Sequence, residues 1–465
     1  MRRTHLRPAV AAVLTVAAAA ALGLAGPSPA SAVSDSVVGP VVAAPRVVPV
    51  LEPATASGRI PTSGQLAAAL ATPLSDPALA GPVGVNVVDA RSGRSRYGAD
   101  ARLPLTPAST VKLLTAVAAI DALGSDHRLV TRVVRPSPGH LVIVGGGDAT
   151  LTTQSATSGP AQQRPASLSR LAALTAQALH QDGVHRVSVS YDASLFVGPS
   201  VDPRWPSDYV TTGVIAPVVA LMTDQGRTSP TSDDRVSDPA AQAAAAFAGQ
   251  LADRGIRISG SVAEVSGRRE SAEVARAAPL ATVESPPVAV LVAQMLRDSD
   301  NQVAEALGRL TAAATDQPAS FKGAAAALLA TAGVRHLPVT GWRLFDASGL
   351  SRDDRATAVG LAATMSVAAQ DPTLSPIVDG LPVAGFTGTL EDRYLSGPAV
   401  LGAGLVRAKT GTLTGTNTQV GLVVTARGRL LAFAFLADHV PSSQTDAARS
   451  ALDRAATALI GGPAP

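Results

Sequence analysis

The order of hydrophobic and polar positions predicts a strand, a turn and a helix in the first third of the chain. Residues 83–89 are rich in valine, and a polar turn at residues 91–94 leads into a return strand. The apolar run at residues 109–123 begins after Pro107 and ends at Gly124, which predicts a helix of about four turns.

The middle of the chain has a different pattern of apolar and turn-forming residues. Short strand-like pieces, such as residues 141–144 and 186–190, alternate with turns rich in Gly, Pro and Ser. One helix-like stretch interrupts them at residues 168–179. We therefore predict a large strand-rich inserted domain over residues 126–284.

Helical patterns return after this segment, at residues 288–296, 303–310 and 321–332. Near the C-terminus two apolar runs, residues 418–425 and 429–437, are joined by a short turn. This arrangement predicts a β-hairpin.

The N-terminus has the pattern of an export signal. Three arginines precede an apolar stretch at residues 9–25, which ends in the small triplet at residues 30–32. We predict a signal peptide over residues 1–32 and an exported, extracytoplasmic protein of the cell wall or a periplasm-like space. A retained membrane anchor is the alternative, and whether the signal is cleaved stays open. Residues 33–60, rich in Val, Pro, Ala and Ser, predict a flexible linker, with a partly ordered arm as the alternative.

Composition narrows the possible chemistry. The chain has 465 residues, 46% hydrophobic and 16% charged, so a large core and two or more domains are expected. It has no cysteine, which excludes disulfides, thiol catalysis and Cys-based metal sites. The net charge is +3, and the predicted signal holds three Arg and no acid, so the remainder is neutral. A nucleic-acid partner is therefore not indicated.

Lysine is rare, and its positions draw attention to the first motif. The chain has three lysines, Lys112, Lys322 and Lys409. Ser109 and Lys112 are three residues apart, so on a helix the amine lies near the hydroxyl. A buried lysine of lowered pKa can take the proton of a nucleophilic serine. The alternative is an ordinary helix start with a capping Ser and a surface Lys.

Two further motifs follow in the sequence. Ser299-Asp300-Asn301 follows a helix-like run. The hydroxyl of Ser299 could relay a proton, and the amide of Asn301 could hold a substrate. Taken alone, a polar turn between helices is the better explanation of this motif. Lys409-Thr410-Gly411-Thr412 precedes the C-terminal hairpin. A cation beside a small Gly on a strand suits a carboxylate bound along a sheet edge, whereas an exposed turn is the alternative.

In this order and spacing the three motifs resemble those of the penicillin-binding serine peptidases. Within them the chain is similar to the low-molecular-mass class C D-alanyl-D-alanine carboxypeptidases and endopeptidases, which carry an insertion between the first two motifs. Residues 107–115, 145–151 and 346–352 resemble the same subfamily, and the second motif continues into Ala304-Glu305. Ala149 stands where proline is usual, and Ala347 and Asp354 are further departures. The resemblance covers about residues 63–455.

The resemblance implies a role for each motif residue. Ser109 would form an acyl-enzyme, Lys112 would act as its base, and Ser299 with Asn301 would relay protons and hold the peptide. Lys409 and Thr410 would bind the terminal carboxylate, and Gly411-Thr412 would line the site. The backbone N–H groups of Ser109 and Thr412 would form the oxyanion hole.

The resemblance also implies an α+β fold of the beta-lactamase/transpeptidase type, with an antiparallel sheet flanked by helices. Residues 61–125 and 285–465 would form this catalytic domain. Its substrate would be a peptidoglycan stem peptide ending in D-Ala-D-Ala, beta-lactams would be covalent inhibitors, and neither a cofactor nor a metal would be needed. No membrane span is expected once the signal is removed.

Two other functions compete with this interpretation. A serine beta-lactamase of class A needs a glutamate near the second motif, and no Glu-x-x-Leu-Asn stretch occurs in the chain. Rapid turnover of penicillin would favour it nonetheless. A non-catalytic penicillin-sensing or wall-binding protein on the same fold would take no covalent penicillin label.

Overall fold

The computed structural model describes residues 58–461, apart from residues 156–159, 161–162, 230 and 267. The predicted signal peptide and residues 33–57 of the predicted linker lie outside the described residues.

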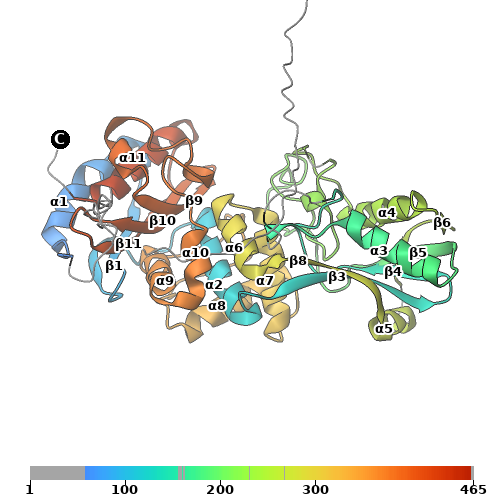
Figure 1. Cartoon of the computed structure of the whole chain (residues 1–465). Helices are drawn as coiled ribbons and strands as arrows, with labels where there is room; N and C mark the ends of the chain where they lie inside the picture. Colours follow the sequence, from blue (N-terminus) through green and yellow to red (C-terminus); the bar gives the residue numbers. More distant parts are fainter. Residues whose placement is uncertain (1–57, 156–159, 161–162, 230, 267, 462–465) are drawn as a thin grey trace, which may run out of the picture. The chain divides into compact units, whose positions relative to one another are not determined.

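A five-stranded antiparallel sheet combines strands from early and late parts of the chain (Figure 1). In spatial order its strands are β2 (Ser95–Ala99), β1 (Val83–Asp89), β11 (Leu430–Ala437), β10 (Thr416–Val424) and β9 (Val406–Leu413). The strand predicted at residues 83–89 and the C-terminal hairpin are confirmed. β9 is an edge strand of this sheet, which leaves one of its sides available for other contacts.

Helices cover both faces of the sheet, as predicted for the α+β fold. Successive residues of β1 point to opposite faces, so that Val87 joins one apolar core and Val88 joins the other. The first core includes α1 (Ser63–Leu74) and α11 (Thr445–Ala458). The second contains a larger group: α2 (Lys112–Leu123), α6 (Val288–Arg297), α7 (Asn301–Ala314), α8 (Phe321–Val334), α9 (Ala358–Gln370) and α10 (Ser375–Asp379).

Local sequence explains where the two helices of the candidate site begin and end. α2 ends at Gly124, whose φ of 88° an L-residue rarely adopts. α7 begins after Asp300, whose carboxylate accepts the backbone N–H of Val303 at 3.0 Å and caps the helix. Both helices are almost entirely buried, which fixes their side chains in space.

A second sheet comes from the segment predicted as an insertion. Its strands are β6 (Arg257–Ile258), β5 (Arg186–Asp192), β4 (His140–Val144), β3 (Arg128–Ser137) and β8 (Pro279–Pro287), with β7 (Ala263–Glu264) beside β5. α3 (Leu168–Gln181) and α4 (Pro239–Ala252) share an apolar core with one face, and α5 (Arg268–Arg276) contributes Val274 to the other.

The predicted insertion contains more helix than the single stretch expected from sequence. α4 is composed largely of alanine, which favours helix but gives little amphipathic contrast, and α5 buries a single apolar side chain, Val274. Phe196, Trp205 and Met222 also pack into the core around α2 and not into the core of the second sheet. The boundaries at residues 126 and 284 stay a prediction.

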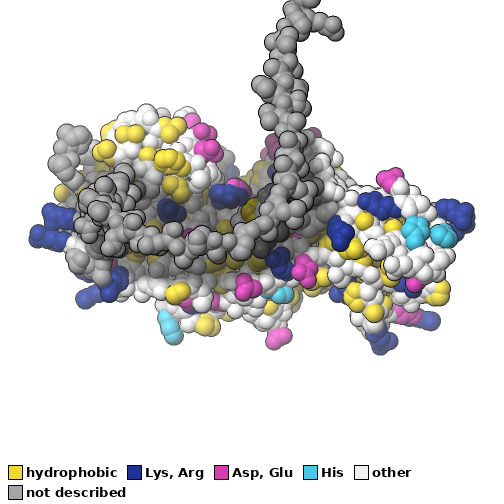
Figure 2. Space-filling view, viewed as in Figure 1, with side chains coloured by type: hydrophobic (Ala, Val, Ile, Leu, Met, Phe, Trp, Pro, Cys, Tyr) yellow, Lys and Arg dark blue, Asp and Glu magenta, His cyan; other side chains and the backbone are white. Residues whose placement is uncertain are grey.

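On the face shown in Figure 2, basic and acidic side chains are interspersed over the described residues. Within the described ranges, none of the helices has the length and apolar character needed to span a bilayer.

Candidate active site

The Ser109 and Lys112 side chains of the first motif are in hydrogen-bond contact. A 3-10 turn over Ala108–Val111 leads directly into α2 and places Lys112 one turn beyond Ser109. The distance from Nζ of Lys112 to Oγ of Ser109 is 2.8 Å. Lys112 is completely buried, whereas Ser109 lines an open cavity. A nucleophile thus faces the cavity with a candidate base behind it.

Two further oxygen atoms surround the Lys112 amine. They are Oδ1 of Asn301 and the carbonyl oxygen of Ser348, each 2.8 Å from Nζ. The Asn301 amide is oriented by its own nitrogen, which donates to the carbonyl of Val214 at 3.1 Å. When Lys112 is neutral, these two acceptors take its two hydrogens. Its lone pair is then directed at the Ser109 hydroxyl, which is the geometry a general base needs.

The charge state of Lys112 is set by opposing effects. Burial lowers its pKa to about 8, because an ammonium group loses its hydration there. The negative charges of Asp346, Glu305 and Asp300 act in the opposite direction. The amine is therefore able to exchange a proton near neutral pH.

Ser299 of the second motif contacts the lysine of the third motif. It has a φ of 58°, in the left-handed region that non-glycine residues seldom adopt, between α6 and α7. Its hydroxyl accepts a hydrogen bond from Nζ of Lys409 at 2.9 Å. The hydroxyl hydrogen of Ser299 is then free to be donated to a group in the cavity.

Lys409 is fully buried, and its amine makes two hydrogen bonds. Besides Ser299, it donates to the carbonyl oxygen of Thr410 at 2.7 Å. Burial, and after it the positive charges of Lys112 and Arg393, hold the pKa of Lys409 well below its usual range. This lysine connects the second motif to the sheet edge.

The outer edge of β9 offers backbone donors to the cavity. Part of this edge is already paired. Val383 forms a bridge with Arg407, and the N–H of Ala408 donates to the carbonyl of Pro382 at 3.0 Å. Alternate residues of a strand point their N–H groups to the same side. The N–H groups of Thr410 and Thr412 therefore face the same edge, where both residues line the cavity.

Gly411 allows β9 to lie against the turn that carries the nucleophile. A Cβ atom at this position would lie 2.2 Å from Oγ1 of Thr418 and 2.8 Å from the carbonyl oxygen of Pro107. Both distances are shorter than van der Waals contact, so any larger residue would push the strand away from Ser109.

The structure brings all eight predicted site residues together. A cavity of about 1260 Å³ is lined by Ser109, Ser299, Asn301, Thr410 and Thr412. The three others, Lys112, Lys409 and Gly411, are buried next to it. The predicted insertion contributes too, because Gln225 donates to Asp300 in the second motif.

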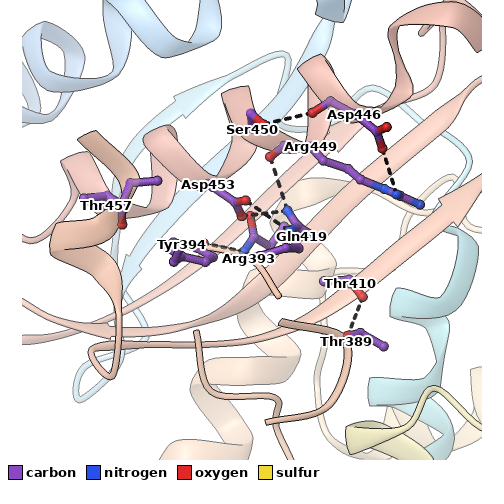
Figure 3. Close-up of polar contacts among 11 residues, drawn as sticks. Thr389, Arg393, Tyr394, Thr410, Gln419, Asp446, Arg449, Ser450, Asp453 and Thr457 are labelled. Carbon is purple, nitrogen blue, oxygen red and sulfur yellow. Dashed lines mark hydrogen bonds and ion pairs between the residues drawn. The ribbon is translucent and has the colours of Figure 1, made fainter. Parts of the chain in front are cut away.

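The cavity continues past Thr410 towards α11, where polar residues form its wall (Figure 3). The hydroxyl groups of Thr389 and Thr410 are 2.7 Å apart. The guanidinium group of Arg393 holds both carboxylate oxygens of Asp453, at 2.6 and 3.0 Å. No sequence pattern indicates this wall, because residues 388–393 lie in a segment without helix or strand periodicity.

Other contributors were also missed. Tyr209 and Val214 come from the predicted insertion, and Arg352 follows the turn at residues 346–351; all three line the cavity. Ser348 belongs to a stretch that the family resemblance had included, but only its backbone carbonyl contacts Lys112. Side-chain patterns in a sequence give no signal for a carbonyl contact of this kind.

The turn at residues 346–351 packs directly against the nucleophile. Gly349 has a φ of 80°, and a Cβ atom there would lie 2.0 Å from the carbonyl oxygen of Ala108 and 3.1 Å from the nitrogen of Ser109. Asp346 braces the turn by accepting the backbone N–H groups of Gly349 at 2.6 Å and Ser351 at 2.7 Å. Close approach and a left-handed backbone both require glycine here.

We expect Gly349→Ala to lower the free energy of unfolding by about 3 kcal/mol, through left-handed strain and backbone overlap. Displacement of Ser109 should also reduce its acylation. Denaturant unfolding and labelling by a fluorescent penicillin measure the two effects. Gly333→Ala is the control, because a Cβ atom there meets nothing within 4 Å. Equal stability of the two variants would contradict the tight packing.

Among the residues that the structure describes, no three His, Cys, Asp or Glu side chains are grouped so that they could hold a metal ion.

Comparison with known proteins gives consistent matches along the chain. Residues 66–235 and 233–459 match the D-Ala-D-Ala carboxypeptidase 3 (S13) family. The chain is 37% identical to carboxypeptidase DacB of Mycolicibacterium smegmatis, over 98% of this chain and 97% of the relative. It is 30% identical to a D-alanyl-D-alanine carboxypeptidase of Actinomadura sp., over 77% and 78% of the two chains.

A solved structure has a similar fold. Penicillin-binding protein 4 of Haemophilus influenzae is matched with a TM-score of 0.66 and 21% identity, over 85% of this chain and 98% of the other. This match supports the beta-lactamase/transpeptidase-like architecture.

Proposed function

The chain belongs to the D-Ala-D-Ala carboxypeptidase 3 (S13) family, and we propose that it hydrolyses peptidoglycan stem peptides ending in D-Ala-D-Ala through an acyl-enzyme on Ser109. One observation carries the assignment of residues. The Lys112 amine lies 2.8 Å from the Ser109 hydroxyl and is oriented by two fixed acceptors.

The contacts support the following acylation step. Lys112 accepts the proton of Ser109 as Oγ attacks the carbonyl carbon between the two D-alanines. The backbone N–H groups of Ser109 and Thr412 stabilise the oxyanion. As the C–N bond breaks, Ser299 donates its proton to the leaving amine and regains one from Lys409 or Lys112. Water then hydrolyses the ester, and D-alanine is the first product.

The third motif would hold the leaving end of the peptide. Thr410 and Thr412 line the cavity at the edge of β9, and Asn301 lies beside Ser109. In this proposal the substrate carboxylate binds to the threonine hydroxyls, and its negative charge favours the protonated form of Lys409 behind Thr410. The cavity beyond Thr410 has room for a leaving group larger than D-alanine, which supports an additional endopeptidase activity.

The setting of the enzyme is part of the proposal. A peptidoglycan substrate lies outside the cytoplasm, which agrees with the export signal predicted for residues 1–32. Beta-lactams would acylate Ser109 in place of the peptide. A beta-lactam complex is known for the Haemophilus influenzae protein of similar fold. Family membership and the assembled motif residues favour this function over the beta-lactamase and non-catalytic alternatives.

The rate of acylation should depend on the protonation of Lys112. Protonated Lys112 cannot accept the Ser109 proton, so kcat/KM should rise about tenfold per pH unit below the pKa and level off above about pH 8. At pH 7 about one molecule in ten would have the neutral amine. The rate of labelling by a fluorescent penicillin, followed from pH 6 to 9, measures this. A flat profile over that range would exclude Lys112 as the titrating base.

A direct experiment tests the function itself. The protein without residues 1–32 is incubated with a stem pentapeptide, with a cross-linked peptide dimer and with penicillin. Release of D-alanine and a persistent penicillin adduct are expected. Rapid hydrolysis of penicillin would identify a beta-lactamase, and the absence of both product and adduct would identify a non-catalytic protein. Cleavage of the dimer would establish the endopeptidase activity.

A further inference from the structure

A buried acidic residue contacts the active site from behind without reaching the substrate cavity. Glu305 lies on α7, has no solvent exposure and does not line the cavity. It takes no part in the acylation step proposed above. Its surroundings nevertheless connect it to the candidate base through a short chain of hydrogen bonds.

Glu305 binds the backbone of the turn at residues 346–351. Its Oε1 atom accepts the N–H groups of Ala347 at 3.1 Å and of Ser348 at 2.8 Å. The carbonyl of the same Ser348 accepts a hydrogen bond from Nζ of Lys112 at 2.8 Å. The backbone of a single residue, Ser348, therefore lies between the carboxyl group and the amine of the base.

The turn has little freedom to move around this contact. Thr115 on α2 donates to the carbonyl of Ala347 at 2.6 Å. Gly308 on α7 also lies so close to Ala347 that a Cβ atom on Gly308 would be 2.4 Å from the Ala347 Cβ. Glu305 is the group that holds the N–H side of this backbone, and without it two buried N–H groups lose their acceptor.

We propose that Glu305 is a positioning residue of this enzyme: its carboxyl group fixes the turn whose Ser348 carbonyl orients the Lys112 amine towards Ser109. The inference rests on the proposed function, in which Lys112 is the base. In this role the Ser348 carbonyl is the acceptor that sets the orientation of the Lys112 amine. If this acceptor moved, a neutral Lys112 could rotate and direct its lone pair away from the hydroxyl.

The charge of Glu305 agrees with this role. Burial, and then the negative charge of Asp346, raise its pKa to about 8, whereas Arg309 on the same helix acts in the opposite direction. Glu305 is therefore mainly protonated at neutral pH. In that form Oε1 still accepts both N–H groups, and Oε2, which has no partner within the described residues, carries the proton.

An uncharged Glu305 also keeps Lys112 available as a base. Lys112 lies among the acidic groups Asp346, Asp300 and Glu305 and the amine of Lys409; Asp354 is a further acid near Glu305. Ionisation of Glu305 adds a negative charge that raises the pKa of Lys112. A glutamine preserves the acceptor and its amide occupies the place of the protonated oxygen, but it cannot ionise.

The test compares Glu305→Gln and Glu305→Ala in the chain without residues 1–32. The readout is the second-order rate of labelling by a fluorescent penicillin from pH 6 to 9. We expect Glu305→Gln to stay within about threefold of the parent at its best pH, with the midpoint of the profile moved to lower pH. Glu305→Ala should lose about a hundredfold at every pH, because the acceptor itself is removed.

Asp148→Asn is the matched control. Asp148 is another buried acid, its pKa is raised to about 6 by burial, and one of its oxygens likewise has no partner within the described residues. It has no contact with Lys112 or with the turn at residues 346–351. Its substitution should leave both the labelling rate and the midpoint unchanged.

The possible outcomes separate the two proposals. Normal labelling of Glu305→Ala would overturn the positioning role while leaving the proposed function intact, and an unchanged midpoint in Glu305→Gln would overturn the effect of the Glu305 charge on Lys112. If Glu305→Ala does not fold, the labelling rate of Glu305→Gln decides alone, because a loss far beyond threefold in a variant that keeps the acceptor would contradict the positioning role. A parent protein that takes no label at any pH would overturn the proposed function and this inference with it.

Discussion

Replacing Ser109 by alanine should lower the rate of D-alanine release from a stem pentapeptide by at least about 10⁴-fold, because Ser109 has the only described hydroxyl group of the cavity lining that is hydrogen-bonded to the amine of Lys112. Covalent labelling by penicillin should disappear entirely. Ser109 is partly exposed, so the loss of its hydroxyl should leave the unfolding temperature nearly unchanged. Product analysis and labelling measure the two effects.

Ser125→Ala is the control for this substitution. Ser125 follows α2 and makes its side-chain hydrogen bond, to the carbonyl of Thr373, away from the cavity. It should retain full activity and labelling. If Ser109→Ala released D-alanine as fast as the parent, the assignment of the nucleophile would be wrong.

The second large effect is expected at Lys112. Methionine fills much of the same volume in this fully buried site but cannot accept a proton. We expect Lys112→Met to slow acylation about 10³-fold, which is the usual contribution of a general base. Lys112→Arg should be similarly slow, since a guanidinium group stays protonated. The labelling rate with penicillin measures both variants.

Lys322→Met is the matched control. It replaces the one lysine that lies outside the site, on the exposed side of α8, and should leave the labelling rate unchanged. The remaining activity of Lys112→Met should also lose the rise with pH towards about 8. A Lys112→Met variant that keeps that rise would show that another group titrates.

The sequence predicted the elements that depend on local patterns. The helix after Pro107, the strand at residues 83–89 and the C-terminal hairpin all have periodic apolar residues between clear turn signals, and the structure contains each of them. α4 and α5 were missed, because neither combines a helical period with a broad apolar stripe.

The candidate site divides in the same way. Ser109 and Lys112 are close because a helical turn joins them, and their separation of three residues can be read directly from the sequence. The residue types of the second and third motifs suggested a proton relay and a carboxylate site, and the family resemblance connected both motifs to Ser109. Their contacts, such as Lys409 with Ser299, join residues 110 positions apart. No local pattern predicts such a distance.

By itself, the sequence identified the family through the identity and spacing of its motif residues, and the resemblance to that family predicted the α+β class and the roles of the eight motif residues. Only the tertiary structure decided what surrounds them: the Ser348 carbonyl on Lys112, the Glu305 carboxyl behind it and the Arg393–Asp453 wall beyond Thr410. These contacts depend on backbone atoms and on helices packed from distant segments. Their positions are set by the packing of the whole core and by no single stretch of chain.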